Sequence, residues 1–153
     1  MKASFLLFAV SNLLLMATTA VAGLLVSGSE GYLRHFLLGV LTALFTCFVH
    51  IVLFMYFVVQ QKIMEQAVAQ DGLDPSFAQR VQVCKSRALR LSAVGMASVV
   101  ITSLLGATIE SGVSPDIHLI AAFTTIFINA FLFYFQFALL DAYRTVFRAA
   151  FNE

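Results

Sequence analysis

The stretch Arg34–Val58, RHFLLGVLTALFTCFVHIVLFMYFV, decides the fold of this chain. Apart from Arg34 at its start, the only side chains in this stretch that can carry a charge near neutral pH are the imidazoles of His35 and His50. An apolar run of about 20 residues is long enough to cross a bilayer as a helix. Because an ionisable side chain is costly at membrane depth, two histidines on one such helix indicate a specific role.

The composition of the whole chain agrees with a membrane location. The chain has 153 residues, of which 61% are hydrophobic and only 11% are charged, whereas soluble domains carry about 25% charged residues. So few charges cannot cover a water-facing surface. We therefore expect an all-α integral membrane protein whose main partner is the lipid bilayer, with no nucleic-acid partner. The two cysteines, Cys47 and Cys84, lie in an apolar run and in a basic loop, so we predict no disulfide.

Four segments are long and apolar enough to span a bilayer. They cover residues 4–26, 36–59, 91–109 and 117–140. Short polar turns join the first span to the second and the third to the fourth, which predicts a four-transmembrane-helix up-down bundle forming a single membrane domain over residues 1–153. The first segment also resembles a cleavable signal peptide, but its apolar run continues to Val26, so we interpret it as a span.

The connection at residues 60–90 is predicted to form a helical hairpin that extends beyond the bilayer. The sequence DGLDP marks its turn, with Asp74 as the cap of the next helix and Pro75 at its first position. The tail, residues 141–153, should continue the fourth helix. Its apolar face is a candidate docking surface and consists of Val146, Phe147, Ala150 and Phe151.

The distribution of Lys and Arg predicts the orientation in the membrane. Eight of the nine basic residues fall at the N-terminus, in residues 60–90 or in the tail, and only Arg34 falls on the other side. Because cytoplasmic loops are enriched in Lys and Arg, both termini and the hairpin are expected to be cytoplasmic. The expected location is a bacterial inner membrane.

Each span carries one polar residue at a similar depth. At about 1.5 Å per residue, these residues lie roughly 18–22 Å from the outer boundary. They are Asn12, His50, Ser98 and Asn129. Such a layer is typical either of a proton or ligand site or of plain hydrogen bonding between helices, which contributes about 0.6 kcal/mol per contact.

The third span also presents small residues at four-residue spacing, Ser98, Thr102 and Gly106. A small-xxx-small face permits close approach of two helices. We expect this face to serve packing within the chain, with a seam between two copies as the alternative.

Two histidines, His35 and His118, begin the second and fourth spans at the predicted outer boundary. These spans run in the same direction, so the two imidazoles should lie at the same height. Imidazoles on two facing helices of a bundle can hold a b-type haem or a metal ion. The arrangement resembles membrane cytochromes b, in which parallel helices each offer two histidines about one leaflet apart. This chain departs from that pattern, because the fourth span has Phe133 and Tyr134 where a second histidine would stand.

Two other interpretations of His35 and His118 remain open at this point. The imidazoles can reach water from a membrane boundary, or they can form a pH-sensitive outer gate. Three carboxylates are near enough in sequence to pair with them, namely Glu30, Glu110 and Asp116. Asp116 is also expected to cap the fourth helix.

The sequence contains no nucleophile–base pair and no carboxylate cluster, which argues against an enzyme. We expect a membrane-embedded accessory or anchor subunit of a larger membrane complex, redox-linked through one b-type haem or metal at His35 and His118. Its partners would be other membrane subunits or further copies of itself. The alternative is a small oligomeric channel or transporter with His50 in its path, although no span carries the Asp, Glu, Lys or Arg that such proteins commonly use.

Overall fold

The computed structural model describes residues 1–112 and 114–151, except for the side chain of Glu110. These residues form helices only, with no strand in the described part. Four helices are each long and apolar enough to cross a membrane. They are α1 (Lys2–Leu24), α2 (Gly28–Asp71), α3 (Pro75–Ala107) and α4 (Pro115–Phe151), with a single 3₁₀ turn, η1 (Ile109–Ser111), between the last two.

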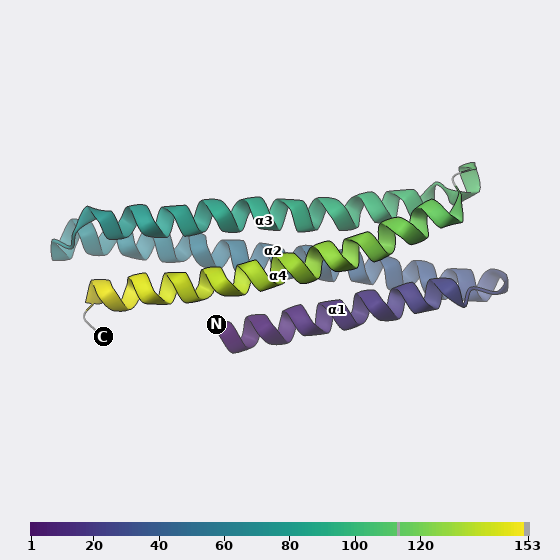
Figure 1. Cartoon of the computed structure of the whole chain (residues 1–153), viewed down its shortest axis with the longest axis horizontal. Helices are drawn as coiled ribbons and strands as arrows, with labels where there is room; N and C mark the ends of the chain where they lie inside the picture. Colours follow the sequence, from purple (N-terminus) through teal and green to yellow (C-terminus); the bar gives the residue numbers. More distant parts are fainter. Residues whose placement is uncertain (113, 152–153) are drawn as a thin grey trace.

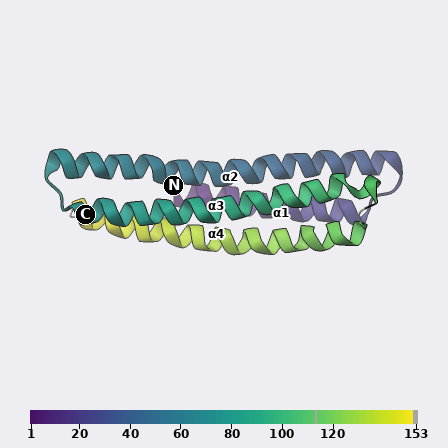
Figure 2. The ribbon, with the colours of Figure 1, turned by 90° about the horizontal axis from the view of Figure 1, so that it is seen from above.

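The four helices lie side by side in one elongated bundle (Figures 1 and 2). The α1–α2 turn lies at one end of the bundle, together with the end of α3 and the start of α4. The α2–α3 turn lies at the other end, near the last turn of α4 (Figure 1). Helix α1 is the shortest and starts about midway along the bundle, so α2, α3 and α4 continue beyond it. In the packing around the bundle, α2 contacts α1 and α3, and α4 contacts α3 and α1, which leaves α2 and α4 as a diagonal pair.

Local sequence signals explain where the helices begin and end. Gly72 ends α2 in the left-handed conformation, with φ of 69°, which costs glycine no steric penalty. Asp74 then caps α3 by accepting a hydrogen bond from the Ser76 N–H at 2.8 Å, as predicted. At the start of α4 the prediction was wrong. Ser114, not Asp116, supplies the oxygen, accepting from the Asp116 N–H at 3.3 Å, because Pro115 takes the first helical position.

The tail continues α4 to Phe151, and its apolar face is covered by the chain itself. Ala150 is buried, and Val146, Phe147 and Phe151 pack against the core formed with α2 and α3. The expectation that this face is a free docking surface was therefore wrong, because the long α2–α3 hairpin lies beside it. Lys2 at the start of α1 forms an ion pair with Asp141 of α4, which ties the shortest helix to the bundle.

Large apolar side chains face outward along the spans of all four helices. Examples are Leu7, Leu44, Leu104 and Phe127, whose exposed fractions are between 61% and 74%. An apolar exterior combined with buried polar side chains is the reverse of a soluble protein. The described part of the chain is thus a helical protein built to be embedded in a membrane.

Candidate functional site

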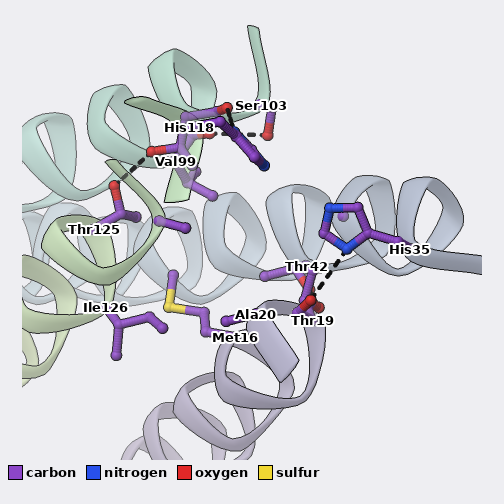
Figure 3. A pocket seen from close by; sticks show the side chains of 13 residues that line it. Met16, Thr19, Ala20, His35, Thr42, Val99, Ser103, His118, Thr125 and Ile126 are labelled. Atoms are coloured by element: carbon purple, nitrogen blue, oxygen red, sulfur yellow. Dashed lines mark hydrogen bonds between the residues drawn. The ribbon is translucent and has the colours of Figure 1, made fainter. Parts of the chain in front are cut away.

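The structure brings His35 of α2 and His118 of α4 together across the diagonal of the bundle. Their ring centroids are 6.1 Å apart and the ring planes are inclined by 73°. Both side chains are half-buried and line one shared cavity near the end that holds the α1–α2 turn (Figure 3). A separation above about 12 Å would have prevented one ligand from contacting both rings, since each metal–imidazole bond is about 2.0–2.1 Å long.

Each of the two imidazoles is held by a backbone carbonyl of the preceding helix. The Nδ1 atom of His35 lies 3.1 Å from the Thr19 carbonyl oxygen, and the Nδ1 atom of His118 lies 3.1 Å from that of Thr102. Because a carbonyl can only accept, Nδ1 must carry the proton and donate it. In the neutral ring, Nε2 is then the free acceptor nitrogen, which is the protonation state of a metal ligand.

Two of the three carboxylates expected beside these histidines do not hold them. Glu30 forms an ion pair with Arg34 on the same helix turn, and Asp116 is exposed. The side chain of Glu110 lies outside the described residues. Backbone carbonyls replace carboxylates because α1 and α3 approach α2 and α4 closely enough for their peptide groups to reach the rings.

Two glycines create the room for these rings. A Cβ atom added at Gly23 would lie 2.8 Å from Cε1 of His35, and one added at Gly106 would lie 2.8 Å from Cε1 of His118. Contacts that short do not occur between real side chains, so any other residue at either position would displace the ring next to it. Both glycines therefore have a steric role in setting the position of the imidazoles.

The two halves of the site are copies of one pattern. In the first hairpin the hydroxyl of Thr19 bonds Thr42 at 2.6 Å, and in the second the hydroxyl of Thr102 bonds Thr125 at 2.7 Å. Each residue of this pattern in the first hairpin stands 83 positions before its counterpart in the second, which is also the offset between His35 and His118. The shared spacing is Thr-x3-Gly-x11-His-x6-Thr. This internal repeat is visible in the sequence, and a search for self-similarity at a fixed offset would have found the missed residues Thr19, Gly23, Thr42 and Thr125.

Further cavities flank the histidine pair on both sides. One lies between α2 and α3 and is lined by His35, Phe36, Gly106 and His118. Another lies between α1 and α4 and is lined by the repeat counterparts of these residues, among them Gly23 and Leu119. The space around the pair is thus extended on two opposite sides and is itself nearly two-fold symmetric.

The donor set limits which group this pair could hold. Among the described residues there is no cluster of three or more His, Cys, Asp or Glu that could bind a metal ion. Zinc sites use three or four protein ligands, so two imidazoles alone do not complete one. Haem iron already has four ring nitrogens and takes axial ligands such as histidine from the protein.

His50 lies deeper in the bundle and belongs to a different site. Its side chain is completely buried. Its Nε2 atom lies 2.9 Å from Oδ1 of Asn129, and its Nδ1 atom lies 3.0 Å from Nε2 of Gln136. The carboxamide oxygen accepts from Nε2–H and the carboxamide N–H donates to Nδ1, so both ring nitrogens of the neutral imidazole are satisfied. The expectation that His50 faces protein and has a polar partner agrees with these contacts.

The four residues expected to form one polar layer divide into two groups. Ser98 accepts a hydrogen bond from Nδ2 of Asn129 at 3.1 Å, so it belongs with His50. Asn12 instead accepts from Thr46 at 3.0 Å, between α1 and α2. Thr46 is the repeat counterpart of Asn129, which places the two groups at equivalent positions of the two hairpins.

Sequence reasoning missed two further members of the His50 group. Gln136 donates to both His50 and Ser92, and the Ser92 hydroxyl donates to the backbone carbonyl of His50. Both side chains are fully buried. Gln136 lies two turns beyond Asn129 on α4, so a search for buried polar residues on the same helix face would have indicated it.

Phe133 occupies the position where a second axial histidine would stand in a cytochrome b. It is the repeat counterpart of His50, and its ring stacks on the His50 ring with centroids 5.1 Å apart and planes inclined by 25°. Since both His50 nitrogens are already bonded and the facing residue is phenylalanine, this level of the bundle has no ligand pair.

The small-residue face of α3 packs against α4 of the same chain. Ser98 and Thr102 bond Asn129 and Thr125, and Gly106 lies against His118. All three residues thus contribute to the contact between these two helices, as expected for packing within the chain.

Comparisons of the chain with protein-family models, with curated proteins and with solved structures found no match. The class of protein therefore follows from the fold and the site alone. The fold is that of a membrane-embedded helical bundle, and the site is a pair of inward-facing imidazoles on two diagonal helices.

Proposed function

We propose that this chain is a membrane-embedded subunit that binds one b-type haem between His35 and His118 and takes part in electron transfer within a larger complex. The observation that carries the proposal is the separation of 6.1 Å between the two ring centroids. If both imidazoles held one iron through metal–nitrogen bonds of about 2.0–2.1 Å, their ring centroids would be about 6 Å apart.

Three features of the surroundings fit a haem better than a bare ion. Among the described residues two nitrogen ligands, His35 and His118, would hold the group, which is enough for a haem but not for a bare ion. Both Nδ1 atoms are bonded to backbone carbonyls, the outer-shell contact that fixes the orientation of ligating histidines. Cavities flank the pair on two opposite sides, where the edges of a flat macrocycle would need space. A bound haem would itself supply the one-electron chemistry.

The contribution of the chain would be to hold and tune that group. The carbonyls of Thr19 and Thr102 would fix the orientation and the tautomer of the two imidazoles. Apolar side chains such as Met16, Val99 and Ile126 line much of the site, and the polarity of the surroundings is one of the factors that set a haem potential. Because the described residues offer one ligand pair and no catalytic cluster, electrons would have to arrive from one partner and leave to another. This is the behaviour of an accessory subunit.

The proposal is tested by the visible spectrum of the protein. We expect protein purified from haem-sufficient cells to show a Soret band and a reduced-minus-oxidised difference spectrum of a b-type haem, with one haem per chain. A preparation that stays colourless after haem is added during reconstitution would contradict the proposal. The histidine pair would then be interpreted as interhelical packing near a membrane boundary.

We further propose that the helices cross the membrane in alternate directions, with both termini and the α2–α3 turn in the cytoplasm. Support comes from the eight-to-one distribution of Lys and Arg. In a background with Cys47 and Cys84 changed to serine, a membrane-impermeant maleimide applied to intact cells should label Ser29→Cys and leave Gln79→Cys unlabelled. Labelling of Gln79→Cys alone would reverse the proposed orientation.

The channel or transporter interpretation receives less support. In this conformation His50, Asn12 and Asn129 are fully buried, and His50 and Asn129 are bonded to neighbouring side chains rather than lining a path. We therefore assign the His50 group a structural role in holding α2, α3 and α4 together.

A further inference from the structure

A groove between α3 and α4 combines two guanidinium groups with an apolar floor. It is lined by Arg87, Arg90, Leu91, Phe135, Ala138, Leu139 and Ala142. Leu91 is the first residue of the third predicted span and residue 140 is the last of the fourth. The groove therefore crosses the boundary between apolar spans and the basic hairpin, with the arginines on the hairpin side and Phe135 on the span side.

The positive charge in this groove is not neutralised by the chain. Among the described residues neither Arg87 nor Arg90 forms an ion pair. The nearest acid in sequence to the α4 wall is Asp141, and it is paired with Lys2. Among the described residues Arg90 makes one hydrogen bond, of 3.4 Å from its Nε to the Ser86 carbonyl, which leaves its remaining N–H donors available.

We propose that this groove binds one anionic phospholipid of the inner leaflet. The phosphate would be bound by Arg87 and Arg90, since guanidinium groups bind phosphate through paired N–H donors. An acyl chain would lie along Phe135, Ala138 and Leu139. Basic pockets between membrane helices on the cytoplasmic side are typical sites for anionic lipid headgroups. The proposal rests on the membrane placement of the chain and is independent of haem binding.

Two variants separate headgroup recognition from acyl-chain packing. Arg87→Gln/Arg90→Gln removes both guanidinium charges from the groove, and Ala138→Trp fills its floor without changing the charge. The matched control is Lys62→Gln/Arg80→Gln, which removes two charges from exposed positions of the same hairpin. The measurement is native mass spectrometry of delipidated protein titrated with phosphatidylglycerol or phosphatidylcholine, with haem content recorded in parallel.

We expect the unmodified protein to retain phosphatidylglycerol at least tenfold more tightly than phosphatidylcholine. Arg87→Gln/Arg90→Gln should weaken phosphatidylglycerol binding roughly thirtyfold, since each basic residue near an anionic surface contributes about 1 kcal/mol. Ala138→Trp should weaken it as well, because the indole would occupy the space of the acyl chain, and the control variant should bind normally. Equal losses in the control would overturn the proposal in favour of non-specific charge attraction. Normal binding by Ala138→Trp would overturn it as well, as would displacement of the lipid by inorganic phosphate at constant ionic strength.

Discussion

Replacing either His35 or His118 with alanine is expected to abolish haem binding, with loss of the Soret band in the purified protein. Each imidazole would supply one of only two protein ligands, and no other His, Cys, Asp or Glu in the described part completes a cluster with them. Because the repeat gives the two histidines equivalent surroundings, the two variants should lose haem to the same extent. Haem content per folded chain, measured by absorbance against protein concentration, checks this result.

Chemical rescue distinguishes loss of a ligand from loss of structure. The cavity left by His35→Ala can admit free imidazole, which should restore the Soret band at millimolar concentration. His35→Met should retain part of the haem with an altered spectrum, because methionine is also an axial ligand. If the alanine variants keep full haem content, or if only one of the two loses it, the diagonal pair is not the haem site.

Gly95→Ala is expected to destabilise the protein by about 2–4 kcal/mol, although alanine usually favours a helix over glycine by up to about 1 kcal/mol. A Cβ atom at Gly95 would overlap the imidazole of His50, three of whose ring atoms lie closer to it than real contacts allow. The ring cannot move freely, because Asn129 and Gln136 hold both of its nitrogens. Overpacking costs about 1–3 kcal/mol, and each buried polar group left without its partner costs about 1–3 kcal/mol more.

The control for this prediction is Gly39→Ala, which is also a glycine within a helical span. A Cβ atom at Gly39 meets nothing within 4 Å, so this variant should be as stable as the unmodified protein or slightly more so. The measurement is thermal unfolding in one detergent, followed by circular dichroism. Equal unfolding temperatures for the two variants would show that His50 is free to move.

A second pair of substitutions tests the hydrogen bonds of the His50 side chain directly. His50→Leu leaves the buried Oδ1 atom of Asn129 without its donor and removes one of the two acceptors of Gln136, whereas Phe48→Leu changes a side chain that is 48% exposed. We expect the first substitution to lower the unfolding temperature clearly and the second to leave it nearly unchanged. Retention of haem by His50→Leu, per folded chain, would agree with a structural rather than a ligating role.

Much of the fold was visible in the sequence because it depends on local properties. The four apolar runs coincide with four long helices, since a bilayer demands about 20 apolar residues per span and internally bonded backbone. The cap at Asp74 and the continuation of the fourth helix through the tail follow from side chains that act on their own neighbours. The prediction that Asp116 caps α4 was wrong for an equally local reason. Pro115 takes the first helical position, which moves the start of α4 two residues earlier and makes Ser114 the cap.

The site needed the tertiary structure, because helix rotation and pairing are not local properties. The sequence alone indicated two histidines at one height, but it did not show that α2 and α4 are diagonal partners or that the rings stand 6.1 Å apart. It also suggested carboxylates as partners, whereas the rings bond the carbonyls of Thr19 and Thr102. Those contacts arise because Gly23 and Gly106 let a ring lie against the neighbouring backbone, which happens only when two helices pack closely at one particular rotation.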